Sequence, residues 1–130
     1  MVGIIVISHG MLCEGIVDSV SMVAGEIEQM KMVSLKPGMS PETYSVMVKD
    51  AIKEVDTGDG AVVFVDLIGG TPFNTIGMLS RDLNAEIVTG MNMAMLVTVA
   101  LERNEDSTMS DLAEAARQAG LEGIRILKRN

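Results

Sequence analysis

The segment that decides the fold is VVFVDLIGGTPFN, residues 62–74. It begins with a run of apolar residues, which is typical of a strand that is buried on both faces of a parallel sheet. The strand ends at an acidic residue, Asp66, and two glycines follow soon after it. Thr71 and Pro72 then have the pattern of a helix N-cap and a first helical residue. We therefore expect a buried strand, a glycine-containing turn and a helix that Thr71 caps and that runs from Pro72 to about Asp82.

The segment GIIVISHGMLCEG, residues 3–15, repeats this design near the N-terminus. An apolar run ends at His9, which is the only histidine of the protein, and Gly10 follows it. Apolar residues then recur at helical spacing. The sequence predicts a strand over residues 2–8 and a helix over residues 11–24.

The remainder of the chain continues the alternation of strands and helices. This alternation within one domain predicts an α/β fold, with helices on both faces of an open, mostly parallel sheet. The common strand order for such a sheet is 2-1-3-4 with a further strand at the edge. We expect a single domain over residues 1–130, in which the C-terminal edge strand is antiparallel. The further strands are predicted at residues 29–35, 61–66, 86–89 and 123–128. The further helices are predicted at 41–55, at 93–102, and from a cap at Ser107 or Ser110 through Ala119, where Gly120 is expected to end the helix.

The composition restricts the classes of protein and of partner. Ten basic and 18 acidic residues give the 130-residue chain a net charge of −8, which disfavours nucleic acid because its binders need a basic face. A single cysteine, Cys13, cannot form an intramolecular disulfide and fits a reducing compartment. No run approaches the roughly 18 apolar residues of a membrane span, and the N-terminus lacks the features of a signal peptide. We therefore expect a cytoplasmic protein.

The two strand ends should meet in space. In sheets of this order, ligands bind at the carboxyl ends of the strands, at the switch point between the first and third strands. His9 and Asp66 occupy those two ends. A carboxylate that holds the proton of one ring nitrogen fixes the tautomer and leaves the other nitrogen free as a nucleophile. We expect Asp66 to orient the imidazole of His9.

Backbone amides should provide an anion site beside this pair. Gly69, Gly70 and Thr71 lead into a helix N-terminus, where unpaired N–H groups and the helix dipole favour an anion. Gly10 and Met11 open a second helix at the same edge. A nucleophilic imidazole, an orienting carboxylate and an anion cradle together favour phosphoryl transfer onto the histidine. No metal and no cofactor is expected to take part.

Other classes of site compete with this interpretation. No G-x-S-x-G hydrolase motif and neither of the nucleotide-binding glycine motifs occurs. The serious rival is a receiver-like signalling module that is phosphorylated on Asp66. Its Mg²⁺ needs a carboxylate pair after the first strand, where this chain has Ser8 and His9. A third alternative is a non-catalytic module, in which His9 only contacts a bound anion.

Over essentially its whole length, the chain resembles a known family. It is similar to the IIA component of mannose-type permeases in the bacterial phosphoenolpyruvate-dependent sugar phosphotransferase system. One departure is Ala94, where the family usually has proline. The stretches that carry the resemblance are IVISHG, KPGMSPET, VFVDLIGGTPFN, TGMNMAML and GIRILK.

The resemblance implies a mechanism and an assembly. His9 would accept a phosphoryl group from the phosphocarrier HPr and pass it to a cognate IIB component, which would link it to a membrane permease. Asp66 would orient the ring, and Thr71 and the loop glycines would receive the phosphate. Family members form homodimers that exchange the C-terminal strand. The IIB component is expected on a separate polypeptide.

A related group of proteins ranks second to the mannose-type IIA components among the resemblances of the chain. The phosphocarrier subunit of phosphoenolpyruvate-dependent dihydroxyacetone kinase shares the expected fold and the histidine, but it lacks a GGTPFN type of loop. The transported sugar is not encoded in the site, because a IIA component passes on the phosphoryl group and does not touch the sugar.

Overall fold

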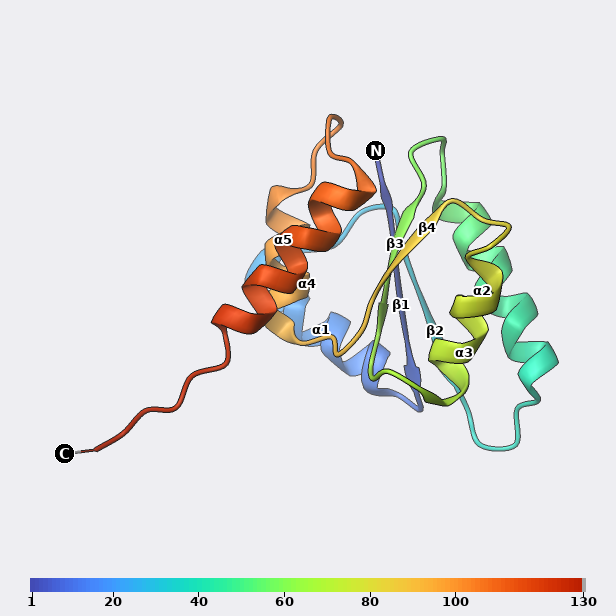
Figure 1. Cartoon of the computed structure of the whole chain (residues 1–130), viewed down its shortest axis with the longest axis horizontal. Coiled ribbons are helices and arrows are strands. Elements are labelled where there is room, and N and C mark those ends of the chain that lie inside the picture. The colour runs from blue at the N-terminus through green and yellow to red at the C-terminus, as the bar shows by residue number, and fades with distance from the viewer. Residues whose placement is uncertain (130) are drawn as a thin grey trace.

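A parallel four-stranded sheet in the order β2-β1-β3-β4 forms the centre of the molecule. The computed structural model describes residues 1–129. All three pairs of neighbouring strands are parallel, as the continuous apolar runs predict (Figure 1). The strands are β1 (Gly3–His9), β2 (Met30–Leu35), β3 (Ala61–Val65) and β4 (Ala85–Val88).

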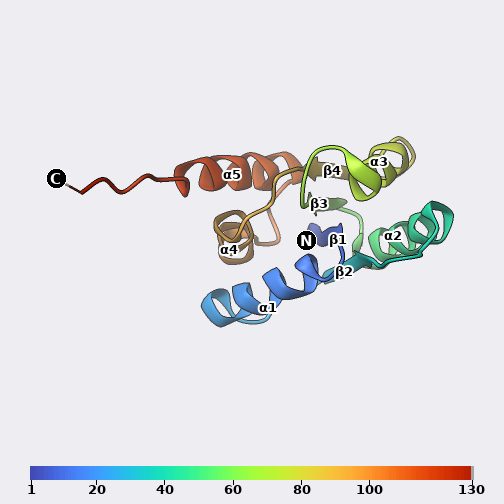
Figure 2. The same cartoon turned by 90° about the horizontal axis from the view of Figure 1, so that it is seen from below.

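Helices cover both faces of this sheet (Figure 2). Within the described part of the chain they are α1 (Leu12–Ala24), α2 (Pro41–Val55), α3 (Gly70–Leu79), α4 (Met93–Glu102) and α5 (Met109–Glu122). α1, α4 and α5 lie on one face, and α2 and α3 lie on the other. Ile4 and Val6 of β1 pack in the first core, whereas Ile5 and Ile7 pack in the second. This alternation explains why the run from Ile4 to Ile7 is apolar at every position.

The predicted fold class and sheet order are confirmed. The four strands of the sheet agree with the prediction to within one residue at their ends, and α2 and α4 have the predicted bounds. Ser40 caps α2, since its Oγ accepts the Thr43 N–H at 3.1 Å. Asn92 caps α4 in the same way, through the Met95 N–H at 3.0 Å. The side-chain caps thus support two boundaries that the sequence placed correctly.

The prediction that Thr71 caps α3 is wrong. The N-cap is Gly69, the helix begins at Gly70, and it ends at Leu79 instead of near Asp82. Gly69 and Gly70 have φ angles of +84° and +79°. These left-handed conformations, which glycine adopts readily, turn the chain into the helix before the threonine–proline pair is reached.

The predicted bounds of α5 are also wrong. Its cap is Thr108, whose Oγ1 accepts the Asp111 N–H at 3.1 Å, and the helix continues beyond Ala119 to Glu122. Gly120 does not end the helix. A Cβ at that position would lie 2.5 Å from the Cε of Met95, so this glycine permits close packing between α5 and α4.

The C-terminal strand predicted at residues 123–128 does not form within the chain. Residues 124–129 have no regular secondary structure and extend away from the body of the molecule (Figure 1). Ile126 and Leu127 are 84% and 93% exposed. A strand needs a neighbour for its backbone hydrogen bonds, and an alternating pattern alone does not supply one. Residue 130, the last of the predicted domain, lies outside the described residues.

The helices of residues 1–129 include none that is both long enough and apolar enough to cross a bilayer.

Candidate functional site

The carboxyl ends of β1 and β3 bring His9 and Asp66 together, as the sequence predicts. The two strands are parallel neighbours, and Ile7 of β1 pairs in register with Val65 of β3. The residues that follow this pair therefore lie side by side at the same edge of the sheet.

Asp66 holds the histidine at two points. Its Oδ2 accepts the main-chain N–H of His9 at 2.9 Å and lies 2.7 Å from the ring Nδ1. Its Oδ1 accepts the main-chain N–H of Leu67 at 2.9 Å. The Asp66 side chain is only 6% exposed, whereas that of His9 is 47% exposed. The carboxylate thus lies beneath a ring that remains accessible, and Nε2 is the nitrogen left for chemistry.

The surroundings of Asp66 favour its charged form. Burial alone raises the pKa of this carboxyl group, because it penalises the charge. Hydrogen bonds from the His9 main chain, the His9 ring and the Leu67 main chain lower the pKa by more. The net pKa lies below its ordinary value, so the carboxylate stays ionised near neutral pH and can stabilise positive charge on the ring.

Gly70 lies against the open side of the ring. A Cβ at this position would lie 2.9 Å from Cε1 and 3.0 Å from Nε2 of His9. Its φ of +79° also suits glycine. The first residues of α3, Gly70 and Thr71, therefore lie beside the free ring nitrogen, at the helix end where amide groups lack partners within the helix.

The turn after His9 is fixed by a residue that the sequence analysis missed. Ser8 is fully buried, and its Oγ donates to the Gly10 carbonyl at 3.1 Å and accepts the Cys13 N–H at 2.8 Å. Gly10, with a φ of +55°, also donates its N–H to the Leu35 carbonyl at 2.7 Å. The sequence feature that could have identified Ser8 is a hydroxyl group directly before the histidine, in an otherwise apolar strand.

A shallow cavity of about 380 Å³ opens at this edge of the sheet. It brings together three predicted site residues, His9, Gly10 and Thr71. Asp66 does not line the cavity, because it lies beneath the ring. Gly69 does not line it either and forms the N-cap of α3. The loop between β2 and α2 also contributes to the cavity, which the sequence did not predict. The remaining lining comes from residues 35–39 and Pro41.

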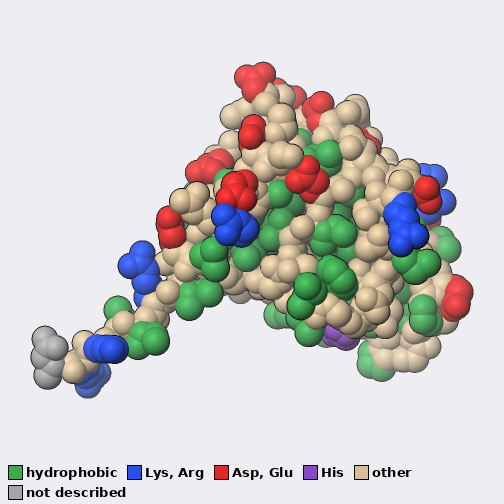
Figure 3. All heavy atoms as spheres, in the orientation of Figure 1, with side chains coloured by type: hydrophobic (Ala, Val, Ile, Leu, Met, Phe, Trp, Pro, Cys, Tyr) green, Lys and Arg blue, Asp and Glu red, His purple; other side chains and the backbone are tan. Residues whose placement is uncertain are grey.

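Large apolar side chains surround the histidine at the surface. Met11 and Leu12 follow its turn and are 71% and 53% exposed, and Leu67 and Ile68 follow Asp66 and are 51% and 70% exposed. Hydrophobic side chains lie beside the histidine at the lower edge of the molecule in Figure 3. An exposed apolar patch around a reactive group is typical of a site that docks another protein.

The described residues contain no group of three or more His, Cys, Asp or Glu side chains arranged to hold a metal ion. Asp66 is also buried and hydrogen-bonded to His9. A receiver-like module needs an acidic cluster and an accessible aspartate, and these observations count against that alternative.

The fold and the site define a class of protein: a parallel α/β domain whose one histidine is held by a buried aspartate at the switch point of the sheet. The family model EIIA-man, described as the PTS system fructose IIA component, matches residues 3–117. The chain belongs to this family, and it is a IIA component of the mannose family of the sugar phosphotransferase system.

Proteins of known sequence show the same similarity. The mannose-specific EIIAB component of Escherichia coli (strain K12) is 30% identical over 128 residues, which are 98% of this chain. The chain spans only 40% of the length of that relative. The fructose-specific EIIA component of Bacillus subtilis (strain 168) is 26% identical, over 86% of this chain and 77% of the relative.

Solved structures are similar over nearly the whole chain. The phosphotransferase system component EIIA from Streptococcus agalactiae is 31% identical with a TM-score of 0.87, and the match covers 97% of each chain. The mannose/sorbose-specific IIA subunit from Enterococcus faecalis is 26% identical with a TM-score of 0.87, over 99% of this chain and 96% of the other. The family resemblance seen in the sequence is thus confirmed.

Proposed function

We propose that this chain is a phosphocarrier in which His9 accepts a phosphoryl group from HPr and passes it to a IIB component for sugar uptake. The observation that carries the proposal is the 2.7 Å contact between His9 Nδ1 and the buried Asp66 carboxylate, which leaves Nε2 free on a half-exposed ring. Membership of the mannose IIA family supports it. We take residues 1–130 as one mannose-type IIA domain.

In the transfer step, the lone pair of His9 Nε2 forms a bond to the phosphorus of the donor. The bond between that phosphorus and the donor breaks, and the donor atom keeps the electron pair. The proton on Nδ1 stays on the ring, because Asp66 Oδ2 accepts its hydrogen bond and balances the positive charge that develops. Transfer to the IIB component is the reverse step with a different partner.

The main chain around the ring is suited to receive the phosphoryl oxygens. Gly69, Gly70 and Thr71 form the N-terminal end of α3 beside Nε2, where free amides and the helix dipole favour an anion. Thr71 and Gly10 line the same cavity as the ring. In this proposal these four residues bind the phosphoryl group, and no metal or cofactor takes part.

The partners are other proteins. The exposed apolar side chains around His9 suit docking of HPr and of the IIB component in turn, each over the same ring nitrogen. The protein would approach the membrane permease only through the IIB component, and it would act in the cytoplasm. The single, buried Cys13 is compatible with that reducing compartment.

The experiment that tests this function is a reconstituted phosphorelay. Incubation with phosphoenolpyruvate, enzyme I and HPr is expected to add one phosphoryl group to the chain, labile to acid and stable to base, and omission of HPr should prevent it. A mannose-type IIB component should then remove the label. Absence of labelling would contradict the proposal, and transfer only to a dihydroxyacetone kinase subunit would favour the related group.

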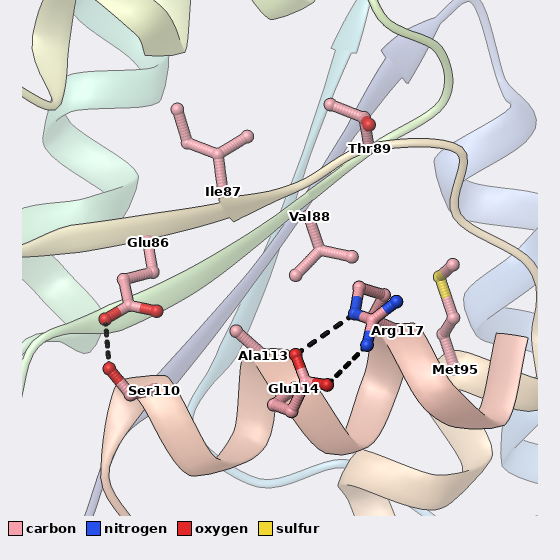
Figure 4. Close-up of a pocket in the computed structure, with 9 residues that line it drawn as sticks. All are labelled: Glu86, Ile87, Val88, Thr89, Met95, Ser110, Ala113, Glu114 and Arg117. Carbon is pink, nitrogen blue, oxygen red and sulfur yellow. Dashed lines mark hydrogen bonds and ion pairs between the residues drawn. The ribbon is translucent and has the colours of Figure 1, made fainter.

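The sheet edge at β4 supports a homodimer. A groove of about 530 Å³ lies between this edge strand and α5. In Figure 4, Ile87 and Val88 come from β4, whereas Ala113 and Arg117 come from α5. An unpaired edge strand invites pairing with another chain, and the exposed, alternating residues 124–129 are a suitable partner segment. We propose that two subunits exchange these segments as antiparallel edge strands.

Assembly is tested by removing the C-terminal segment. The full-length chain is expected to sediment as a dimer at micromolar concentration, because exchange of identical segments forms a closed, symmetric pair. Deletion of residues 122–130 should give an unstable or aggregating protein, because the edge strand β4 and the groove beside it would remain uncovered. A compact, stable monomer, for either the full-length or the truncated chain, would overturn this assembly without affecting the histidine chemistry.

A further inference from the structure

We propose that Lys36 is a cationic contact for the phosphoryl group during its transfer to and from His9. In this role its ammonium group balances part of the phosphoryl charge at the open side of the ring. The inference rests on the proposed phosphocarrier function and extends it to a residue outside the histidine–aspartate pair and the amides of α3.

The position of Lys36 follows from the sheet. β2 is the neighbour of β1, and its last residue, Leu35, pairs in register with His9. The Leu35 carbonyl also accepts the Gly10 N–H at 2.7 Å. Lys36 is the next residue of the chain, so it lies at the same carboxyl edge as the histidine turn. Lys36, His9 and Thr71 line one cavity.

The charge at this cavity depends on Lys36. It is the one Lys or Arg among the lining residues, and no acidic residue lines the cavity. Among residues 1–129, Lys36 forms no ion pair, whereas Lys31 of the preceding strand β2 is paired with Glu54 at 3.1 Å. Lys36 is exposed. Its ammonium group is therefore free to meet an anion at the mouth of the cavity.

Because the chain is negatively charged overall, a cation near His9 would favour the binding of an anionic group there. The net charge is −8, and a phosphoryl group adds about −1.5 to −2 more near neutral pH. The net negative charge of the chain opposes the approach of a phosphorylated donor. A cation beside the acceptor nitrogen attracts the donor's phosphoryl group and stabilises the product.

The test compares three variants in the phosphorelay. Lys36→Gln removes the charge, Lys36→Arg keeps it, and Lys49→Gln removes the charge of a lysine that is also exposed but lies on α2, outside the cavity. We expect Lys36→Gln to lower kcat/KM for phosphoryl transfer from phospho-HPr about tenfold at low salt. The Lys36→Arg and Lys49→Gln variants should stay within about twofold of the wild type.

Two further measurements distinguish a direct contact between Lys36 and the phosphoryl group from a general electrostatic attraction of the donor. The equilibrium share of phosphorylated protein, measured against phospho-HPr, should fall several-fold in Lys36→Gln alone, because a contact stabilises the product itself. Its rate defect should shrink as salt is added. If Lys36→Gln matches Lys49→Gln in both rate and equilibrium, the inference is wrong while the phosphocarrier function stands. If the wild type itself accepts no phosphoryl group, both fail.

Discussion

The His9→Ala variant is expected to accept no phosphoryl group in the reconstituted phosphorelay, which is the largest effect that we predict for any single change. His9 is the only histidine of the chain, and its Nε2 is the nucleophile in the proposed step. Removal of the ring leaves no other imidazole to form the acid-labile, base-stable adduct. Labelling from phosphoenolpyruvate through enzyme I and HPr, followed by intact-mass measurement, provides the readout.

The fold should survive this change. The His9 side chain is 47% exposed and belongs to neither hydrophobic core, so His9→Ala should still unfold cooperatively, at a somewhat lower temperature because Asp66 loses the ring as a hydrogen-bond partner. A cooperative thermal transition then assigns the loss of labelling to the missing ring. A phosphoryl group that persists in His9→Ala, or that requires Mg²⁺ on this chain, would favour phosphorylation of Asp66 in a receiver-like module.

The Asp66→Asn variant is expected to transfer the phosphoryl group about 10²- to 10⁴-fold more slowly, the range typical of a lost acid–base or orienting group. Asparagine has nearly the same shape, but it lacks the charge that holds the Nδ1 proton and balances the developing ring charge. Single-turnover transfer from phospho-HPr measures the effect. Asp50→Asn, a change of the same kind at an exposed position of α2, is the control and should be neutral. Wild-type rates in Asp66→Asn would remove the carboxylate from the mechanism.

The same variant should change the pH dependence of stability. The folded-state pKa of Asp66 is below its ordinary value, so the carboxylate contributes stability above that ordinary value. This contribution is lost as the pH falls through the lower, folded-state pKa. Unfolding by denaturant, measured from neutral to acidic pH, should show a smaller loss for Asp66→Asn than for the wild type. Equal losses would contradict this contribution.

The sequence by itself determined the sheet and the central pair of the site. Continuous apolar runs ending at His9 and Asp66 predicted two buried parallel strands, and the usual strand order placed their ends together. Both expectations hold, because the periodicity of buried residues is a local property and few topologies connect such strands. The resemblance to the mannose IIA family was likewise readable from short, contiguous stretches.

Tertiary structure decided the features that depend on distant contacts. The sequence predicted Thr71 as the cap of α3, but Gly69 is the cap and the helix begins at Gly70, beside the His9 ring. Gly120 had the pattern of a helix end, but its contact with Met95 makes it a packing position within α5.

Distant contacts also decide which residues line the site and whether the C-terminal segment forms a strand. Lys36 lies 27 positions along the chain from His9, and only the pairing of β2 with β1 places both at one cavity. Residues 123–128 have a strand pattern, but they form no strand because no segment within residues 1–129 pairs with them. A pattern of apolar residues in the sequence indicates which faces of a segment can be buried. Backbone pairing and cavities depend on which segments meet in space.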